Sequence, residues 1–193
     1  MEPMSAPTLV LISGFARAGK DTLAEGILEW SRRPSRKTSF AAHLKDAAND
    51  FLWSLNMEGD FHNDAFKTKH RDVLVTLGKF ARSLNPDIFA ENLAHYVPIQ
   101  MTPDEVAPET VVCSDWRYIN ELRVCQSILW DLGWKVRTVY VSTAGVGPAN
   151  DEELDSICEI KQFHSFDQEF VFAPNSRQCI LAEGRHLAKT WNL

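Results

Sequence analysis

The chain has 193 residues, of which 45% are hydrophobic and 24% are charged, as is typical of a soluble globular protein with a sizeable buried core. No apolar run reaches the roughly 18 residues that a membrane span needs, and the N-terminus lacks the basic region and apolar stretch of a signal peptide. We therefore expect a cytoplasmic protein without a membrane partner. The four cysteines form no C-x-x-C pair, and the net charge of -6 argues against a surface devoted to nucleic acid.

The N-terminal part of the chain is predicted to run from strand to glycine loop to helix. Residues 9–13 (LVLIS) are a short, branched apolar run that ends at Gly14, which predicts a buried parallel strand before a tight turn. Apolar residues then recur at helical spacing over residues 23–30. Residues 37–40 predict a second strand, and residues 41–55 predict the next helix.

The remaining elements follow a helical middle third. Residues 67–101 predict two helices joined near Asn85 and Pro86, and residues 101–109 predict an exposed connection. After it, strands and helices alternate. The expected strands are 110–114, 135–141 and 169–173. Three helices are expected in the same part of the chain: one after residue 115 that ends near residue 131, one over 150–160 and one over 177–191.

The loop after the first strand, GFARAGK at residues 14–20, matches the pattern G-x-x-x-x-G-K. In this pattern the glycines let backbone N–H groups turn inward around phosphate oxygens, and the lysine reaches the outer phosphates. The following helix adds its positive N-terminal end. We therefore expect the loop to hold the phosphates of a nucleoside triphosphate, above all ATP. The expected contacts come from Gly14, Ala16, Arg17, Ala18, Gly19, Lys20, Asp21 and Thr22.

The residues after the lysine depart from the usual pattern, which has Ser or Thr directly after Lys. Here Lys20 is followed by Asp21 and then by Thr22. Either side chain can serve Mg²⁺, through a carboxylate or through a hydroxyl. The sequence does not choose between them.

The alternation of strands and helices, together with this loop, predicts an α/β protein with the three-layer P-loop NTPase fold. We expect a five-stranded, mostly parallel sheet with helices on both faces. Residues 1–193 are expected to form a single kinase domain with a helical acceptor-binding insertion at about 41–101. Ligands of such folds bind at the carboxyl ends of the strands, where Gly14 and Asp115 both fall.

Four stretches resemble the deoxynucleoside monophosphate kinases of large DNA bacteriophages. They are GKDT at 19–22, Phe40 with Leu44-Lys45, Arg71 before Leu77-Gly78, and DWRYINE at 115–121. The resemblance implies transfer of the γ-phosphoryl group from ATP, with Mg²⁺, to the 5′-phosphate of a deoxynucleotide in an infected bacterium. It also implies that Lys45 contacts the substrate. The middle third of the chain carries the weaker part of the match.

Phosphoryl transfer depends on positioning and on cations, and three residues are assigned to these tasks. Lys20 is expected to serve the phosphates. Asp115 ends a buried strand and is expected to orient magnesium, water or an arginine; the alternative is a cap for the helix after it. Arg117 is assigned to phosphate or substrate binding, and the alternative is a surface ion pair with Glu121.

The acceptor is assigned to the middle third. Arg71 and Arg82 are eleven residues apart on one predicted helix, which returns them to nearly the same face, so they are candidates to grip the acceptor phosphate together. The alternative is a solvated helix face. Asp87 is a candidate for contacts to the acceptor sugar or base. After the fourth strand, where the resemblance implies Arg-Pro, the chain has Ser142 and Thr143, so an expected cation is missing.

Two other functions compete with this assignment. Related bacteriophage kinases phosphorylate 5-hydroxymethyluracil within DNA during thymidine hypermodification. DNA as the acceptor would need a basic groove, for which residues 31–37 and 67–71 are candidates, unless both are solvated surface. The third hypothesis is a nucleotide-controlled binding module without transfer. The expected partners are the nucleotides, with DNA only in the alternative; the sequence leaves open whether the protein is a homodimer.

Overall fold

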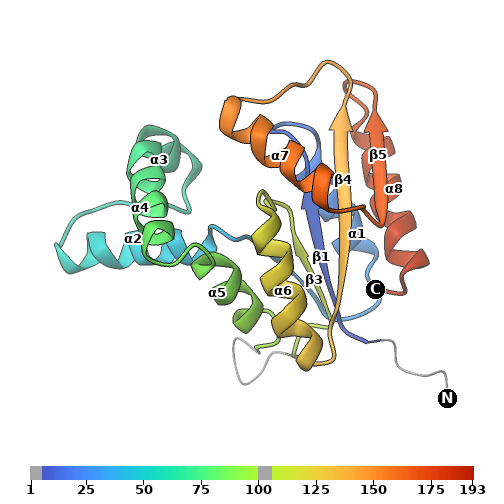
Figure 1. The fold of residues 1–193 in the computed structure, drawn as a ribbon, viewed down its shortest axis with the longest axis horizontal. Helices are drawn as coiled ribbons and strands as arrows, with labels where there is room; N and C mark the ends of the chain where they lie inside the picture. The colour runs from blue at the N-terminus through green and yellow to red at the C-terminus, as the bar shows by residue number, and fades with distance from the viewer. Residues whose placement is uncertain (1–5, 100–105) are drawn as a thin grey trace.

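A computed structural model describes residues 6–99 and 106–193 and shows a five-stranded sheet with helices on both faces (Figure 1). All four strand pairings are parallel, in the order β2-β3-β1-β4-β5. The strands are β1 (Thr8–Ser13), β2 (Ser35–Thr38), β3 (Thr110–Cys113), β4 (Lys135–Thr143) and β5 (Gln168–Phe172). The predicted α/β, three-layer P-loop NTPase fold is confirmed, with a sheet that is wholly parallel.

The helices form two layers because the buried residues of β1 alternate between two apolar cores. Leu9 and Leu11 face the layer that contains α5 and α6, whereas Val10 and Ile12 face α1 and α8. The helices are α1 (Lys20–Trp30), α2 (Ala42–Ser54), α3 (Asp64–Lys69), α4 (Arg71–Leu84), α5 (Ile88–Tyr96), α6 (Ile119–Asp131), α7 (Asp151–Phe163) and α8 (Arg177–Thr190). Among the described residues, no helix is long and apolar enough to cross a membrane.

The insertion between β2 and β3 consists of helices in its described part, as predicted, and α2, α3 and α4 extend to one side of the sheet (Figure 1). The break expected near Asn85 is present, because the Asn85 side chain accepts a hydrogen bond from the Asp87 backbone N–H at 2.9 Å before α5 begins. The short helix α3 was not predicted as a separate element. Its N-terminus is capped by Asn63, which accepts bonds from the next helical N–H groups.

The second strand lies two residues earlier than predicted. Ser35–Thr38 pair with Thr110–Cys113, but the chain leaves the sheet before Phe40. The backbone N–H of Phe40 donates instead to the carboxylate of Asp115 at 2.9 Å. The predicted bounds of this strand, 37–40, were wrong because the side chain of Asp115, distant in sequence, accepts the hydrogen bond that a neighbouring strand would otherwise have accepted from Phe40. Residues 100–105 of the predicted connection lie outside the described residues.

Candidate active site

The loop between β1 and α1 has a backbone that only its two glycines allow. Gly14 has φ +142°, and a Cβ there would lie 2.0 Å from the carbonyl oxygen of Val141. Gly19 has φ +97°, and a Cβ there would lie 2.7 Å from the Ile180 side chain. Helix α1 begins directly after Gly19, so its free N–H groups face the loop. The loop therefore has the geometry of an anion site.

The ammonium group of Lys20 is folded over this loop. It donates hydrogen bonds of 2.7 Å to the carbonyl oxygens of Gly14 and of Phe15. Burial lowers the pKa of Lys20, and the positive charge of Arg117 lowers it further, whereas three carboxylates act in the opposite sense. These carboxylates belong to Glu153, Asp21 and Asp115. Lys20 is thus the centre of the charged groups around the loop.

The two candidate metal ligands point to different neighbours. Asp21 accepts a hydrogen bond of 2.7 Å from the hydroxyl of Ser114, at the carboxyl end of β3, and pairs with Lys37 at 2.7 Å. Burial alone would raise the pKa of Asp21, but these hydrogen bonds lower it below its usual value. Thr22 instead accepts a bond of 3.3 Å from Arg177 on α8. Of the two candidates, Asp21 is therefore the one that has another possible metal ligand beside it, the hydroxyl oxygen of Ser114.

A magnesium ion at Asp21 would depend on phosphate and water oxygens as well. The described residues contain no group of three or more His, Cys, Asp or Glu side chains that could hold a metal ion. Such a cluster is not needed for Mg²⁺, because proteins usually bind this ion through only one or two carboxylates, together with several waters and the phosphates of a substrate. The carboxylate of Asp21 and the hydroxyl of Ser114 fit such a site.

Asp115 ties the end of β3 to the start of the insertion. Its carboxylate accepts hydrogen bonds from the backbone N–H groups of Phe40 at 2.9 Å and Ala41 at 3.3 Å, and from the thiol of Cys113 at 3.1 Å. Burial, followed by the negative charge of Asp115, raises the pKa of Cys113, so this cysteine is a neutral donor. Asp115 therefore caps the turn before α2, and not the helix that follows it in sequence.

The turn between β3 and α6 presents Arg117 to solvent, whereas Glu121, in the first turn of α6, is buried. The Glu121 side chain, within a residue that is only 3% exposed, accepts hydrogen bonds from the backbone N–H groups of Arg117 at 2.9 Å and of Tyr118 at 3.1 Å. The surface ion pair considered for Arg117 and Glu121 is therefore not formed. Burial raises the pKa of Glu121 to about 8, although these hydrogen bonds and the nearby Arg82 oppose the shift.

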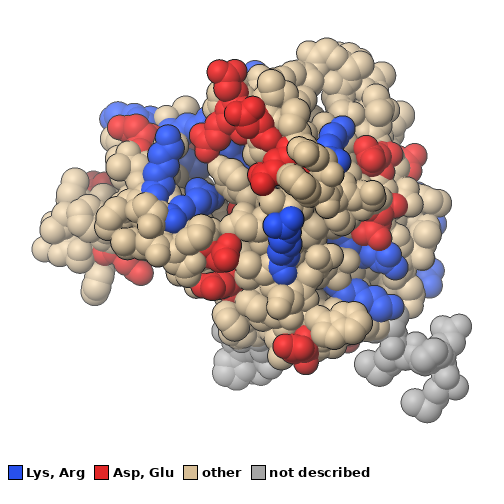
Figure 2. Space-filling model, in the orientation of Figure 1, with Lys and Arg blue, Asp and Glu red and all other residues tan. Residues whose placement is uncertain are grey.

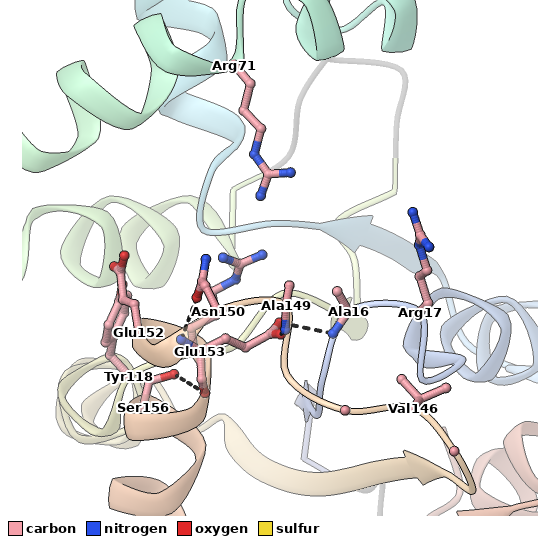
Figure 3. Close-up of a pocket in the computed structure, with 13 residues that line it drawn as sticks. Ala16, Arg17, Arg71, Tyr118, Val146, Ala149, Asn150, Glu152, Glu153 and Ser156 are labelled. Carbon is pink, nitrogen blue, oxygen red and sulfur yellow. Dashed lines mark hydrogen bonds between the residues drawn. The ribbon is translucent and has the colours of Figure 1, made fainter.

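A cavity of about 500 Å³ lies next to the phosphate loop (Figure 3). Its walls come from the loop, from the start of α4, from the β3–α6 turn, and from the β4–α7 loop with the start of α7. Arg17, Arg71 and Arg117 all line it, and the guanidinium groups of these three form no hydrogen bond or ion pair with any described residue. Three unpaired cations from three different elements therefore border one cavity, which suits an anionic ligand.

The other residues assigned to the acceptor do not line this cavity. Arg82 stacks over the rings of Phe89 at 4.7 Å and Tyr118 at 4.9 Å, so it supports the β3–α6 turn and is not brought together with Arg71. Asp87 accepts a hydrogen bond of 2.7 Å from the side chain of Asn120. Lys45 lies on α2, also outside the lining.

Helix α7 brings two acids to the site that the sequence did not indicate. Glu153 accepts a hydrogen bond from the backbone N–H of Ala16, in the phosphate loop, at 2.9 Å. Glu152 accepts one from the hydroxyl of Tyr118 at 2.8 Å. Figure 2 shows acidic side chains over the start of α7, next to basic side chains between α7 and α4. Acids after Asn150 predict only a helix start, so no sequence signal pointed to these contacts.

Comparisons with known proteins give likenesses in structure but none in sequence. No protein-family model matches the chain, and no curated protein matches it. A sugar kinase from Janibacter sp. HTCC2649 is 12% identical, with a TM-score of 0.48 over 96% of this chain and 94% of that one. A gluconokinase from Sinorhizobium meliloti 1021 is 10% identical, with a TM-score of 0.48 and coverage of 96% and 94%. A shikimate kinase from Bacteroides thetaiotaomicron is 9% identical, with a TM-score of 0.48 and coverage of 96% and 99%. These values carry no substrate and no residue role over to this chain.

Proposed function

We propose that this protein is an ATP-dependent kinase that transfers the γ-phosphoryl group to the 5′-phosphate of a deoxynucleoside monophosphate. The observation that carries the proposal is the set of unpaired guanidinium groups, from Arg17, Arg71 and Arg117, around a cavity next to Lys20. Donor and acceptor phosphates together bring several negative charges to one place. Transfer of the γ-phosphoryl group between them depends on the positioning of both phosphates and on positive charge around them more than on covalent catalysis by the protein.

The residues at the loop divide this task among themselves. Lys20 leaves its contacts with the loop carbonyls to bind the outer phosphates of ATP, while Arg117 adds positive charge from the β3–α6 turn. Asp21, with Ser114 beside it, holds Mg²⁺ either directly or through water. The bound ion supplies further neutralisation of the phosphate oxygens. Arg71, from the insertion, is the cation for the acceptor.

A phosphate acceptor suits this site better than a hydroxyl acceptor. A phosphate monoester has its second pKa at about 6, so its oxygen is already ionised at neutral pH and needs no general base. A hydroxyl group needs one. The carboxylates of Asp115 and Glu152 already accept hydrogen bonds from other groups of the protein. The geometry therefore favours the mononucleotide over the hydroxymethyl group of a DNA base.

The basic run at residues 31–37 also argues against DNA as the acceptor. Arg33 pairs with Glu109, and Lys37 pairs with Asp21. Arg36 donates hydrogen bonds to the carbonyl oxygens at the end of α5, which are those of Tyr96, Val97 and Ile99. Three of its four cations thus serve contacts within the protein, and a phosphate-binding groove needs free ones. The assignment to bacteriophage metabolism remains a prediction from the sequence.

The proposal is tested by incubating the protein with ATP labelled at the γ-phosphate, Mg²⁺ and one acceptor at a time. The acceptors are the individual deoxynucleoside monophosphates and DNA that contains 5-hydroxymethyluracil. We expect label on at least one mononucleotide and none on DNA. Label on DNA alone would replace the acceptor by the modified base. Binding of ATP without transfer to any acceptor would favour the non-catalytic binding module.

A further inference from the structure

The phosphate loop already holds an anion, which belongs to the protein itself. One carboxylate oxygen of Glu153 accepts the hydrogen bond from the Ala16 N–H at 2.9 Å, across 137 positions in the sequence (Figure 3). Ala16 is a member of the loop whose backbone N–H groups are arranged for phosphate oxygens. A carboxylate oxygen carries negative charge and accepts hydrogen bonds, as a phosphate oxygen does. Glu153 thus stands in for part of the ligand.

The start of α7 is built to hold this carboxylate in place. The second oxygen of Glu153 accepts a hydrogen bond from the backbone N–H of Ala149 at 2.7 Å. The backbone N–H of Glu153 donates to the side chain of Asn150, the N-cap of α7, at 2.9 Å. One side chain therefore links the phosphate loop, the β4–α7 loop and the first turn of α7. Such a link keeps the start of α7 against the cavity.

A bound triphosphate cannot share this arrangement. Its oxygens need the N–H groups of the loop and the ammonium group of Lys20, which here donates to the loop carbonyls. The Glu153 carboxylate competes for one of these donors, and its negative charge repels the phosphates at short range. Binding therefore requires the carboxylate to leave Ala16, which breaks the link between the phosphate loop and the first turn of α7.

We propose that Glu153 is an internal competitor for the nucleotide, which lowers the affinity of the phosphate loop and couples its occupancy to the position of α7. This inference rests on the proposed function only in that it takes residues 14–20 as the phosphate site. It concerns binding and not transfer. It can therefore fail while the kinase assignment stands.

The first test is the binding of ATP and of inorganic tripolyphosphate, measured by calorimetry. We compare the unchanged protein with Glu153→Gln and with Asp151→Asn. The second variant removes the same charge from the same turn of α7, where Asp151 is exposed. Because the Gln side chain keeps the shape but not the negative charge, it competes less strongly for the Ala16 N–H, and Glu153→Gln is expected to bind both ligands roughly tenfold more tightly. Asp151→Asn is expected to change the affinity less than about threefold.

The outcomes separate the inference from the proposed function. Tighter binding by Glu153→Gln alone supports the competitor. Binding by all three proteins with equal dissociation constants, or an equal gain in both variants, overturns the competitor and leaves the kinase assignment intact. Failure of the unchanged protein and of both variants to bind either ligand overturns the phosphate site, and with it both proposals.

A second measurement does not depend on the folding of any charge variant. Cys158 is exposed on α7, so it accepts a spin label once the other exposed cysteine, Cys179, is changed to Ser. The remaining cysteines, Cys113 and Cys125, are buried. Saturating tripolyphosphate is expected to change the mobility of the label, because the turn that carries Glu153 is released. An unchanged spectrum at full occupancy overturns the movement of α7.

Discussion

Glu121, the buried acid in the first turn of α6, allows the sharpest prediction about what holds the β3–α6 turn in place. Glu121→Ala removes the acceptor for the backbone N–H groups of Arg117 and Tyr118, which now bond to it at 2.9 Å and 3.1 Å. An unsatisfied buried N–H costs about 1–3 kcal/mol, and water can reach the exposed Arg117 more easily than Tyr118. We therefore expect the free energy of unfolding to fall by about 2–4 kcal/mol.

The pH dependence of stability gives the same residue a signature of its own. Because burial raises the pKa of Glu121 from 4.5 to about 8, the folded state favours the protonated acid. The contribution of this raised pKa to the free energy of unfolding is complete below pH 4.5 and is lost above pH 8. Between pH 4.5 and 8 it decreases by up to about 1.4 kcal/mol per pH unit. Glu121→Gln resembles the neutral acid and removes this slope.

Urea unfolding of the unchanged protein and of Glu121→Gln, from pH 5 to pH 8, measures the difference directly. We expect the unchanged protein to lose more stability than the variant as the pH rises, since the other ionisable groups are common to both. Parallel curves would refute the argument from burial. If Glu121 also holds Arg117 in place, Glu121→Ala should lower kcat more than it raises the KM for ATP, measured where the variant is folded.

Three further predictions concern the phosphates and the metal. Lys20→Ala should remain folded and lose transfer by a few orders of magnitude, since a positioned cation is worth several kcal/mol; turnover at the unchanged rate would exclude the loop mechanism. Asp21→Asn should raise the Mg²⁺ concentration for half activity by about tenfold or more, whereas Thr22→Ala should not; the reverse result would move the metal to the threonine. Arg71→Ala should raise the KM for the acceptor or lower kcat, and Arg32→Ala should do neither; salt-sensitive DNA binding that depends on Arg32 would favour the DNA acceptor.

The parts of the fold that depend on local sequence were predictable. Residues 9–13 form a strand because a branched apolar run can only be buried in the sheet, and Gly14 must follow because no side chain fits beside Val141. The bounds of β2 were not predictable in the same way. Its end is decided by the hydrogen bond from Phe40 to Asp115, between residues 75 positions apart.

Helical spacing predicted the shared face of Arg71 and Arg82 but not the neighbours of each. At about 1.5 Å per residue, eleven residues separate the two along the helix axis by roughly 16 Å. The first turn of α4 therefore reaches the cavity, whereas the last turn reaches the rings of Phe89 and Tyr118. Which partner an arginine finds depends on the packing of α4 against distant elements, and no local pattern contains that information.

The charges after β4 show why the site itself was only partly predictable. The resemblance implied a cation there, yet the chain has Ser142 and Thr143. The charged side chain that contacts the phosphate loop from this part of the chain is instead the carboxylate of Glu153. An acid in the first turn of a helix is explained equally well by the helix dipole, so its contact with Ala16 follows only from the pairing of β4 beside β1, which brings both loops to one edge of the sheet. The three arginines at the cavity come instead from the phosphate loop, the insertion and the β3–α6 turn, so none of them is supplied by α7 or by the loop before it.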